Sequence, residues 1–214
     1  MVTGDTAAPA WQGGDLVSWV SQFGHAGGFA GLAGGVVGAA ATLFVHQWLP
    51  YWRRPQLVIE HGSGVMVDTP ATTGTPGETA RERYARIRVR NQGRSVAKNV
   101  RCMIERIVFF PAGAGAELND EEVLDLLWVF VHGITCDIPS MSHRFGELCH
   151  ASQVAGGPVV LKLGARDVPL RFAALLKAGG LFEFHVLTTA DNASTSRTVI
   201  RVRWTGTVEG LNIE

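Results

Sequence analysis

The sequence has no excess of charge of either sign, because 19 lysine and arginine residues are balanced by 19 aspartate and glutamate residues. Charged residues make up only 18% of the 214 positions, below the usual quarter. Such a chain lacks the basic footprint of a nucleic-acid-binding domain. We therefore expect no nucleic-acid partner, and the length leaves room for one ordinary domain beside a membrane segment.

The sequence also lacks the motifs of the common enzyme classes, with no GxGxxG, Walker loop, GxSxG or HExxH. We therefore predict that the protein is not an enzyme, with no catalytic residues and no cofactor. The alternative is an enzyme or ligand sensor. Its pocket would be lined by His132, His143, His150 and His185.

Cysteine is scarce, and Cys102, Cys136 and Cys149 form an odd set without CxxC spacing. This pattern favours free thiols in a reducing compartment, although one disulfide stays open if the body lies outside the cytoplasm. The best metal-ligand set adds His132 and His150 to Cys136 and Cys149, because these side chains suit zinc. However, neighbours such as Cys149 and His150 point to opposite faces of a strand. We therefore predict no metal site.

One long uncharged stretch stands out against this background. Residues 26–45 contain no charge, and Thr42 is the only polar side chain among them. At about 1.5 Å per residue, 20 residues span the roughly 30 Å hydrocarbon core, so we predict a transmembrane helix. The aromatic residues Trp48, Tyr51 and Trp52 and then Arg53 and Arg54 follow, as is typical of a membrane exit. The alternative is a buried helix or glycine-rich linker in a soluble protein.

Basic residues are missing from one side of this predicted span. The first 52 residues contain no lysine or arginine, whereas all 19 basic residues lie from Arg53 onward. The positive-inside rule then places the amino terminus outside and the body in the cytoplasm, at a cell (inner) membrane. The region before the span is acidic and long for a signal peptide, so we expect no cleavage.

The predicted membrane region has two further features. In the tail, residues 1–25, an apolar i, i+3, i+4, i+7 pattern at 16–23 indicates either a short interfacial helix or an early start of the span. In the span, small residues recur at every fourth position, which favours close helix–helix packing with a protein partner or a second copy. The predicted packing residues are Gly27, Gly31, Gly34, Gly35 and Gly38.

The body, residues 53–214, has the pattern of an antiparallel β domain. In 84–90, Ile87 and Val89 share one face of a strand while Arg86, Arg88 and Arg90 share the other. Gly93 follows in a turn, where it is free to adopt positive φ. The remaining strands are predicted at 56–60, 99–110, 128–133, 144–149, 159–163, 180–189 and 197–205, with a further short piece near 135–138. We predict loops at 62–80, 112–127 and 191–196, the second with one or two helical turns, and a short helix at 170–177. Seven or eight short strands indicate a sandwich.

The stretch from Tyr84 to Ile104 has an alternating strand, then Asn91-Gln92-Gly93, then Ala97-Lys98-Asn99-Val100 and a second strand. It resembles bacterial immunoglobulin-like domains, including the cell-adhesion-related domain. The chain also resembles uncharacterised small bacterial membrane proteins in which one N-terminal transmembrane helix precedes such a sandwich. Their sandwich ends in an Asp-Asn-Ala turn and a Trp-x-Gly strand, which Asp191-Asn192-Ala193 and Trp204-Thr205-Gly206 match. The resemblance implies an immunoglobulin-like β-sandwich after a single membrane helix, and it implies almost nothing about function.

Arginine outnumbers lysine 16 to 3 in the sequence. The candidate docking face consists of Arg86, Arg88, Arg90, Arg201 and Arg203. Guanidinium groups favour carboxylate and phosphate partners, although such a row is also the ordinary wet face of a sheet. The leading hypothesis is a single-pass, non-enzymatic interaction or scaffolding module. The same fold placed outside the cell as an adhesion or envelope module is the other alternative.

Overall fold

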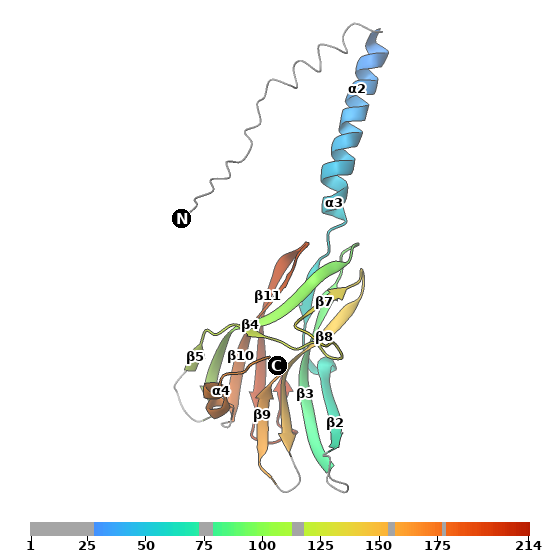
Figure 1. Ribbon diagram of the computed structural model, residues 1–214. Helices are drawn as coiled ribbons and strands as arrows, with labels where there is room; N and C mark the ends of the chain where they lie inside the picture. Colours follow the sequence, from blue (N-terminus) through green and yellow to red (C-terminus); the bar gives the residue numbers. More distant parts are fainter. Residues whose placement is uncertain (1–27, 73–78, 113–117, 154–156, 177–178) are drawn as a thin grey trace, which may run out of the picture. The chain divides into compact units, whose positions relative to one another are not determined.

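The computed structural model describes residues 28–72, 79–112, 118–153, 157–176 and 179–214 (Figure 1). The chain divides into two units, Met1–Trp52 and Arg53–Glu214. In the first unit, α2 (Gly28–Leu43), the π-helical turn η1 (Phe44–Trp48) and α3 (Leu49–Trp52) follow one another without a gap. Among the described residues, no helix combines the length and the hydropathy needed to cross a bilayer. The predicted tail pattern at 16–23 and the first two residues of the predicted span lie outside the described residues.

The second unit is built from two antiparallel sheets. In its described residues, five strands form one sheet in the order β1-β3-β8-β9, with β2 also paired to β3. Seven strands form the other sheet in the order β12-β11-β10-β4-β5, with β6 and β7 also paired to β4. The strands of the five-stranded sheet are β1 (Leu57–Glu60), β2 (Met66–Thr72), β3 (Thr79–Asn91), β8 (His143–Gln153) and β9 (Val159–Leu163). Those of the seven-stranded sheet are β4 (Ala97–Pro111), β5 (Leu118–Asp120), β6 (Leu124–Asp125), β7 (Thr135–Ile138), β10 (Gly180–Ala190), β11 (Ala193–Trp204) and β12 (Asn212–Ile213).

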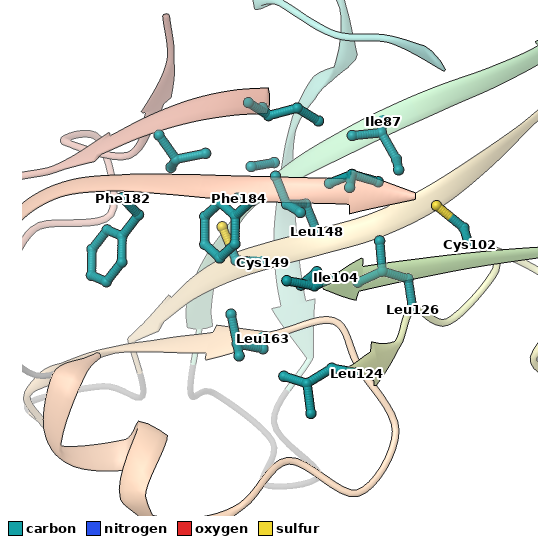
Figure 2. Close-up of a cluster of buried hydrophobic side chains, with 14 of the residues drawn as sticks. Ile87, Cys102, Ile104, Leu124, Leu126, Leu148, Cys149, Leu163, Phe182 and Phe184 are labelled. Atoms are coloured by element: carbon teal, nitrogen blue, oxygen red, sulfur yellow. The ribbon is translucent and has the colours of Figure 1, made fainter. Parts of the chain in front are cut away.

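The core lies between the inner faces of these two sheets. Ile87 and Leu148 of the five-stranded sheet and Ile104 and Phe184 of the other belong to one buried cluster (Figure 2). Each has no exposed surface, as the alternation of apolar and polar residues along the strands requires. The prediction of a mainly β sandwich is thus confirmed, with more strands than the seven or eight expected.

Two predicted loops contain strands. Residues 66–72, assigned to a loop because of nearby glycine and proline, form β2 and pair with an extended β3 from Met66↔Ala85 to Thr72↔Thr79. The predicted 112–127 loop contains β5 and β6, and no helical turn occurs in its described part. In both segments, pairing with a long neighbouring strand outweighs the local composition.

Two other boundaries differ from the prediction. The apolar run 128–133 is a turn segment, in which Trp128 makes only an isolated bridge to Gly146. The hairpin loop expected at 191–196 contains two residues, because Ala190 already pairs with Ala193. The polar residues after Ala193 continue β11 as a largely exposed part of the hairpin, which explains why their composition resembled a loop. The predicted helix near 170 is α4 (Leu170–Leu175).

Candidate functional site

The predicted arginine face is divided between the two sheets. Arg86, Arg88 and Arg90 lie on β3 in the five-stranded sheet, whereas Arg201 and Arg203 lie on β11 in the other. The structure therefore brings together three of these residues in one row and two in another, and not all five.

Carboxylates accompany most of these arginines. Glu60 Oε2 lies 2.6 Å from Arg88 Nε, and Glu60 Oε1 lies 3.8 Å from an Arg90 nitrogen. On the other sheet, Arg201 pairs with Glu183 at 2.8 Å and Arg203 with Glu214 at 2.5 Å. Such exposed pairs contribute little to stability, typically about 0–1 kcal/mol, but they reduce the positive potential that would attract an acidic partner. Docking through these rows stays a prediction.

The predicted helix-packing residues occupy α2, except Gly27, which lies outside the described residues. Gly31, Gly34, Gly35 and Gly38 follow along this helix. A methyl group added at Gly35 or Gly38 would meet no atom of the chain within 4 Å. At these two glycines, the surface is open to a partner.

The cysteines are free thiols, and Cys102 and Cys149 are buried. Burial raises the pKa of Cys102 to about 12 and that of Cys136 to about 11, and it raises the pKa of Cys149 as well. Reactivity requires the thiolate, so these thiols are poor nucleophiles at neutral pH. No group of three His, Cys, Asp or Glu residues that could hold a metal ion occurs in the described part of the chain.

The four histidines of the predicted pocket are distributed over different elements. His143 and His150 lie on β8, His185 lies on β10 in the other sheet, and His132 lies in the turn segment after Trp128. They do not line one common pocket. His150, however, belongs to a polar cluster, and His143 lines a hollow beside Phe130. The sequence did not predict these features, which are described below together with the end of the sandwich around Asn91.

The first feature is a polar cluster around Tyr84 on the five-stranded sheet. The pairing of β3 with β8 shifts between Ala85 and Arg86, so that Ala85 faces Cys149 and Arg86 faces Glu147. This bulge leaves Leu148 and Cys149 both buried, although they are adjacent. As a result, Glu147 and His150, three residues apart, lie close together, whereas a regular strand would place them on opposite faces.

The polar cluster contains two carboxylates. Glu147 Oε1 lies 2.6 Å from His150 Nδ1, and the Tyr84 hydroxyl donates to Glu82 Oε2 at 2.5 Å. The Tyr84 and His150 ring centroids are 5.0 Å apart, and the Arg86 guanidinium carbon lies 5.0 Å from the Tyr84 ring centroid. The bond to Glu147 orients the His150 imidazole and leaves Nε2 for another partner.

The environment of Tyr84 keeps its hydroxyl protonated. Burial, the hydrogen bond to Glu82 and the negative charges of Glu82 and Glu147 raise the pKa of Tyr84 to about 12, while Arg86 opposes the shift. Since this pKa is higher in the folded chain than the ordinary value near 10, the folded state retains a proton that the unfolded state loses.

A pH-dependent stability follows from Tyr84. Its contribution should be fully present below about pH 10 and should be lost as the pH rises through about 12. Tyr84→Phe removes this titration. In chemical denaturation between pH 9 and pH 11.5, we expect the wild type to lose stability more steeply than Tyr84→Phe. Parallel curves for the two proteins would contradict the assignment, and the buried thiols titrate equally in both.

The second feature is the end of the sandwich around Asn91, which we call the Asn91 end (residues 53–56, 91–96, 139–142 and 191–192). Asn91 is fully buried, and its Oδ1 accepts hydrogen bonds from the backbone N–H groups of Gln56 and Gly93. Its Nδ2 lies within 3.3 Å of the carbonyl oxygens of Ser95, Ile138 and Pro139. Asn91 therefore connects three separate segments of the chain.

Gly93 is required at this end by close packing. A Cβ at Gly93 would lie 2.4 Å from the Arg54 carbonyl oxygen and 2.5 Å from Gln56 N and Pro55 Cα. Among the described glycines, only Gly62, Gly133 and Gly206 have positive φ, so Gly93 does not use the positive φ that was open to it. The Asn-x-Gly motif works here by hydrogen bonding and by close backbone approach.

Large apolar side chains are exposed near the Asn91 end. Phe130 is 98% exposed and Met141 is 64% exposed, and both have positive φ, at 63° and 57°. A bulky residue in this backbone conformation is uncommon and costs about 1–2 kcal/mol. Strain of this kind is concentrated at binding and catalytic sites.

A hollow of about 230 Å³ lies beside Phe130. It is lined by Val129, Phe130, Val131, His143, Arg144 and Phe145. The Val129 N–H donates to the Phe145 carbonyl oxygen at 2.8 Å, and the Trp128 indole donates to the Ile134 carbonyl oxygen at 3.1 Å, which fixes the turn segment. In the sequence, the apolar run 128–133 is the one sign of this hollow, but its β propensity favours a strand over a turn.

No family model matches this sequence, and no curated protein matches it significantly. Among solved structures, the chain is similar to one described as "X-ray structure of Northeast Structural Genomics Consortium target SoR45". The two are 12% identical, and the match covers 67% of this chain and 80% of that chain with a TM-score of 0.29.

Proposed function

We propose that the protein is a single-pass, membrane-anchored interaction module whose immunoglobulin-like sandwich docks a protein partner in the cytoplasm. The observation that carries this proposal is Phe130, a strained and almost fully exposed aromatic side chain beside a hollow. Aromatic side chains next to pockets are the usual anchors of protein interfaces. The apolar run in 26–45 supplies the anchor.

Strand order supports the immunoglobulin-like assignment. Strands β1, β3 and β8 are neighbours in one sheet, and β11, β10 and β4 are neighbours in the other, with β7 next to β4. In immunoglobulin-like domains, the first, second and fifth core strands share one sheet and the third, sixth and seventh share the other. Here β1, β3, β4, β8, β10 and β11 take six of these roles. The additions to this core are β2, β5, β6, β7, β9 and β12.

Apolar exposure supports the anchor. In the helical unit, Val36, Val37, Leu43, Phe44 and Val45 are each at least 50% exposed. An uncharged helix with such side chains on its surface requires lipid or another helix to cover them. The basic residues from Arg53 onward and the free thiols support a cytoplasmic body.

The size of the hollow supports a protein partner over a small molecule. Pockets that bind ligands are typically about 300–1,000 Å³, which is larger than the 230 Å³ beside Phe130. A hollow of this size suits a single side chain of a partner. His143 and Arg144 at its border add hydrogen-bond donors that would favour a polar or acidic residue next to that side chain.

Photocrosslinking from the hollow tests this proposal. Phe130→p-benzoylphenylalanine in intact cells is expected to give one protein adduct of defined mass, because the docked partner is held in place. The matched control is Leu170→p-benzoylphenylalanine, since Leu170 is 91% exposed on α4. Similar diffuse products at both positions, or an adduct with lipid alone at Phe130, would contradict the proposal.

The polar cluster around Tyr84 favours a second candidate, a ligand sensor or enzyme. An imidazole held by a carboxylate, with a protonated tyrosine beside it, is an arrangement suited to proton transfer. The crosslinking experiment separates the two proposals. Docking at Phe130 should be unchanged by His150→Ala, whereas a sensor that controls docking from this cluster should lose it.

A further inference from the structure

We infer that the partner docks at Phe130 with an extended segment, which adds as a short strand beside His143 on the open edge of β8 and places one apolar side chain in the hollow. The inference rests on the proposed docking function and specifies the kind of segment that the partner presents.

The direction of the main-chain groups along β8 follows from its pairing with β3. The Asn91 N–H donates to the Ser142 carbonyl oxygen at 2.9 Å, and the register between the two strands is regular through residues 143–147. Main-chain groups of successive residues in such a pair point alternately toward the partner strand and away from it. The groups of Ser142, and of every second residue after it, therefore face β3. Those that face away belong to His143, Phe145 and Glu147.

The turn segment after Trp128 covers only part of this outer edge. The Val129 N–H donates to the Phe145 carbonyl oxygen at 2.8 Å, but at Phe130, where φ is 63°, the chain turns away from β8. In the part of the chain that the structure describes, the outward N–H and C=O groups of His143 have no hydrogen-bond partner, and the residue is exposed. One strand position beside β8 is therefore open.

This open position suits an extended peptide. The His143 N–H requires an acceptor and its C=O requires a donor, and one residue of an added antiparallel strand supplies both. In strand addition, main-chain hydrogen bonds give affinity and pockets for side chains give specificity. Here the pocket is the hollow of about 230 Å³, which His143 and Phe130 line together. A segment whose main chain is already paired within its own fold could not make these bonds.

Charge is of secondary importance at this position, because cations and carboxylates are mixed around it. Arg90 lies opposite His143 on β3, and Arg144 follows His143 in the chain. Glu60 lies 3.8 Å from Arg90, and both Asp137 and Arg144 lie close enough to Cys136 to act on its thiol. We therefore expect the extended backbone and the apolar side chain to determine binding more than an acidic residue does.

Proline at position 143 tests the inference in the full-length chain that carries Phe130→p-benzoylphenylalanine in intact cells. Because the His143 N–H points away from β3, His143→Pro removes the donor to the partner and no bond of the β3–β8 pairing. The adduct yield should fall by about fivefold or more, as expected for the loss of one main-chain hydrogen bond. His143→Ala keeps this N–H and should retain most of the adduct.

Val199→Pro is the matched proline control. The Glu214 N–H donates to the Arg201 carbonyl oxygen at 2.9 Å, so the N–H of Val199, two residues earlier on β11, also points away from β10. This variant should leave the adduct yield unchanged.

Hydrogen exchange gives a second measurement on the wild-type chain in detergent micelles. The probe is a synthetic peptide with the sequence of the crosslinked segment, as identified by mass spectrometry of the adduct. Its binding should slow amide exchange at His143 by at least about tenfold, because the amide becomes hydrogen-bonded. Exchange at Arg144, whose N–H already faces β3, should not change.

The outcomes separate the inference from the proposed function. If position 130 gives no defined protein adduct in the otherwise unchanged chain, the proposed docking function itself fails. If the adduct forms and persists in His143→Pro, docking stands and strand addition is overturned. If both proline variants lose the adduct, unchanged exchange at His143 overturns the inference. An adduct between two copies of this chain would identify a second copy as the occupant and would also overturn it.

Discussion

Replacing Asn91 by alanine is expected to lower the free energy of unfolding of the sandwich by about 3 kcal/mol or more. The substitution removes the acceptor of the Gln56 and Gly93 N–H groups and the donor to three carbonyl oxygens. Each buried polar group left without a partner costs about 1–3 kcal/mol. Chemical denaturation of the full-length protein in detergent micelles, followed by the β signal in circular dichroism, measures the change.

Gln92→Ala is the matched control, because Gln92 is the next residue and its side chain is exposed. It should stay within about 0.5 kcal/mol of the wild type, as most surface substitutions do. An Asn91→Ala protein as stable as Gln92→Ala would show that water replaces the amide and that the connection between the three segments is not structural.

Truncation of Trp204 is expected to have an effect of at least similar size. Trp204 is 2% exposed in the core, and its indole N–H donates to the Thr207 carbonyl oxygen at 3.1 Å. Trp204→Ala leaves a cavity between the sheets and is expected to cost about 3–5 kcal/mol. Thermal and denaturant unfolding measure this loss.

The control for Trp204 comes from the same strand. Val199 is 45% exposed on β11, so Val199→Ala removes little buried surface and should change stability by less than about 1 kcal/mol. Equal losses in the two variants would mean that β11 contributes through its backbone pairing and that the core is not centred on Trp204.

The sequence predicts the long central strands of the fold well. Ile87 and Val89 alternate with arginines on β3, and Phe182 and Phe184 alternate with Glu183 on β10, because one face of each sheet is buried and the other is wet. That period of two is visible without knowledge of the partner strands. It does not reveal which sheet a strand joins, so the arginines of β3 and β11 could not be separated.

The candidate sites depend on departures from this period, which the sequence shows only indirectly. In Glu147-Leu148-Cys149-His150, two adjacent apolar residues interrupt the alternation, and this is the one local sign of the bulge that brings Glu147 to His150. Around Phe130, the sequence favours the wrong element. Its β propensity and apolar neighbours favoured a strand, whereas tertiary contacts hold it in a turn with positive φ.

The Asn91 end also determines how the body would bear mechanical load. Tension arriving through Arg53 reaches Pro55 and Gln56 first and then β1, which pairs with β3 from Leu57↔Asn91 to Glu60↔Arg88. Interstrand hydrogen bonds lie perpendicular to the strands. A pull along β1 therefore loads these bonds and those of Asn91 together, in shear. The attachment resists such a force as one unit and does not open bond by bond.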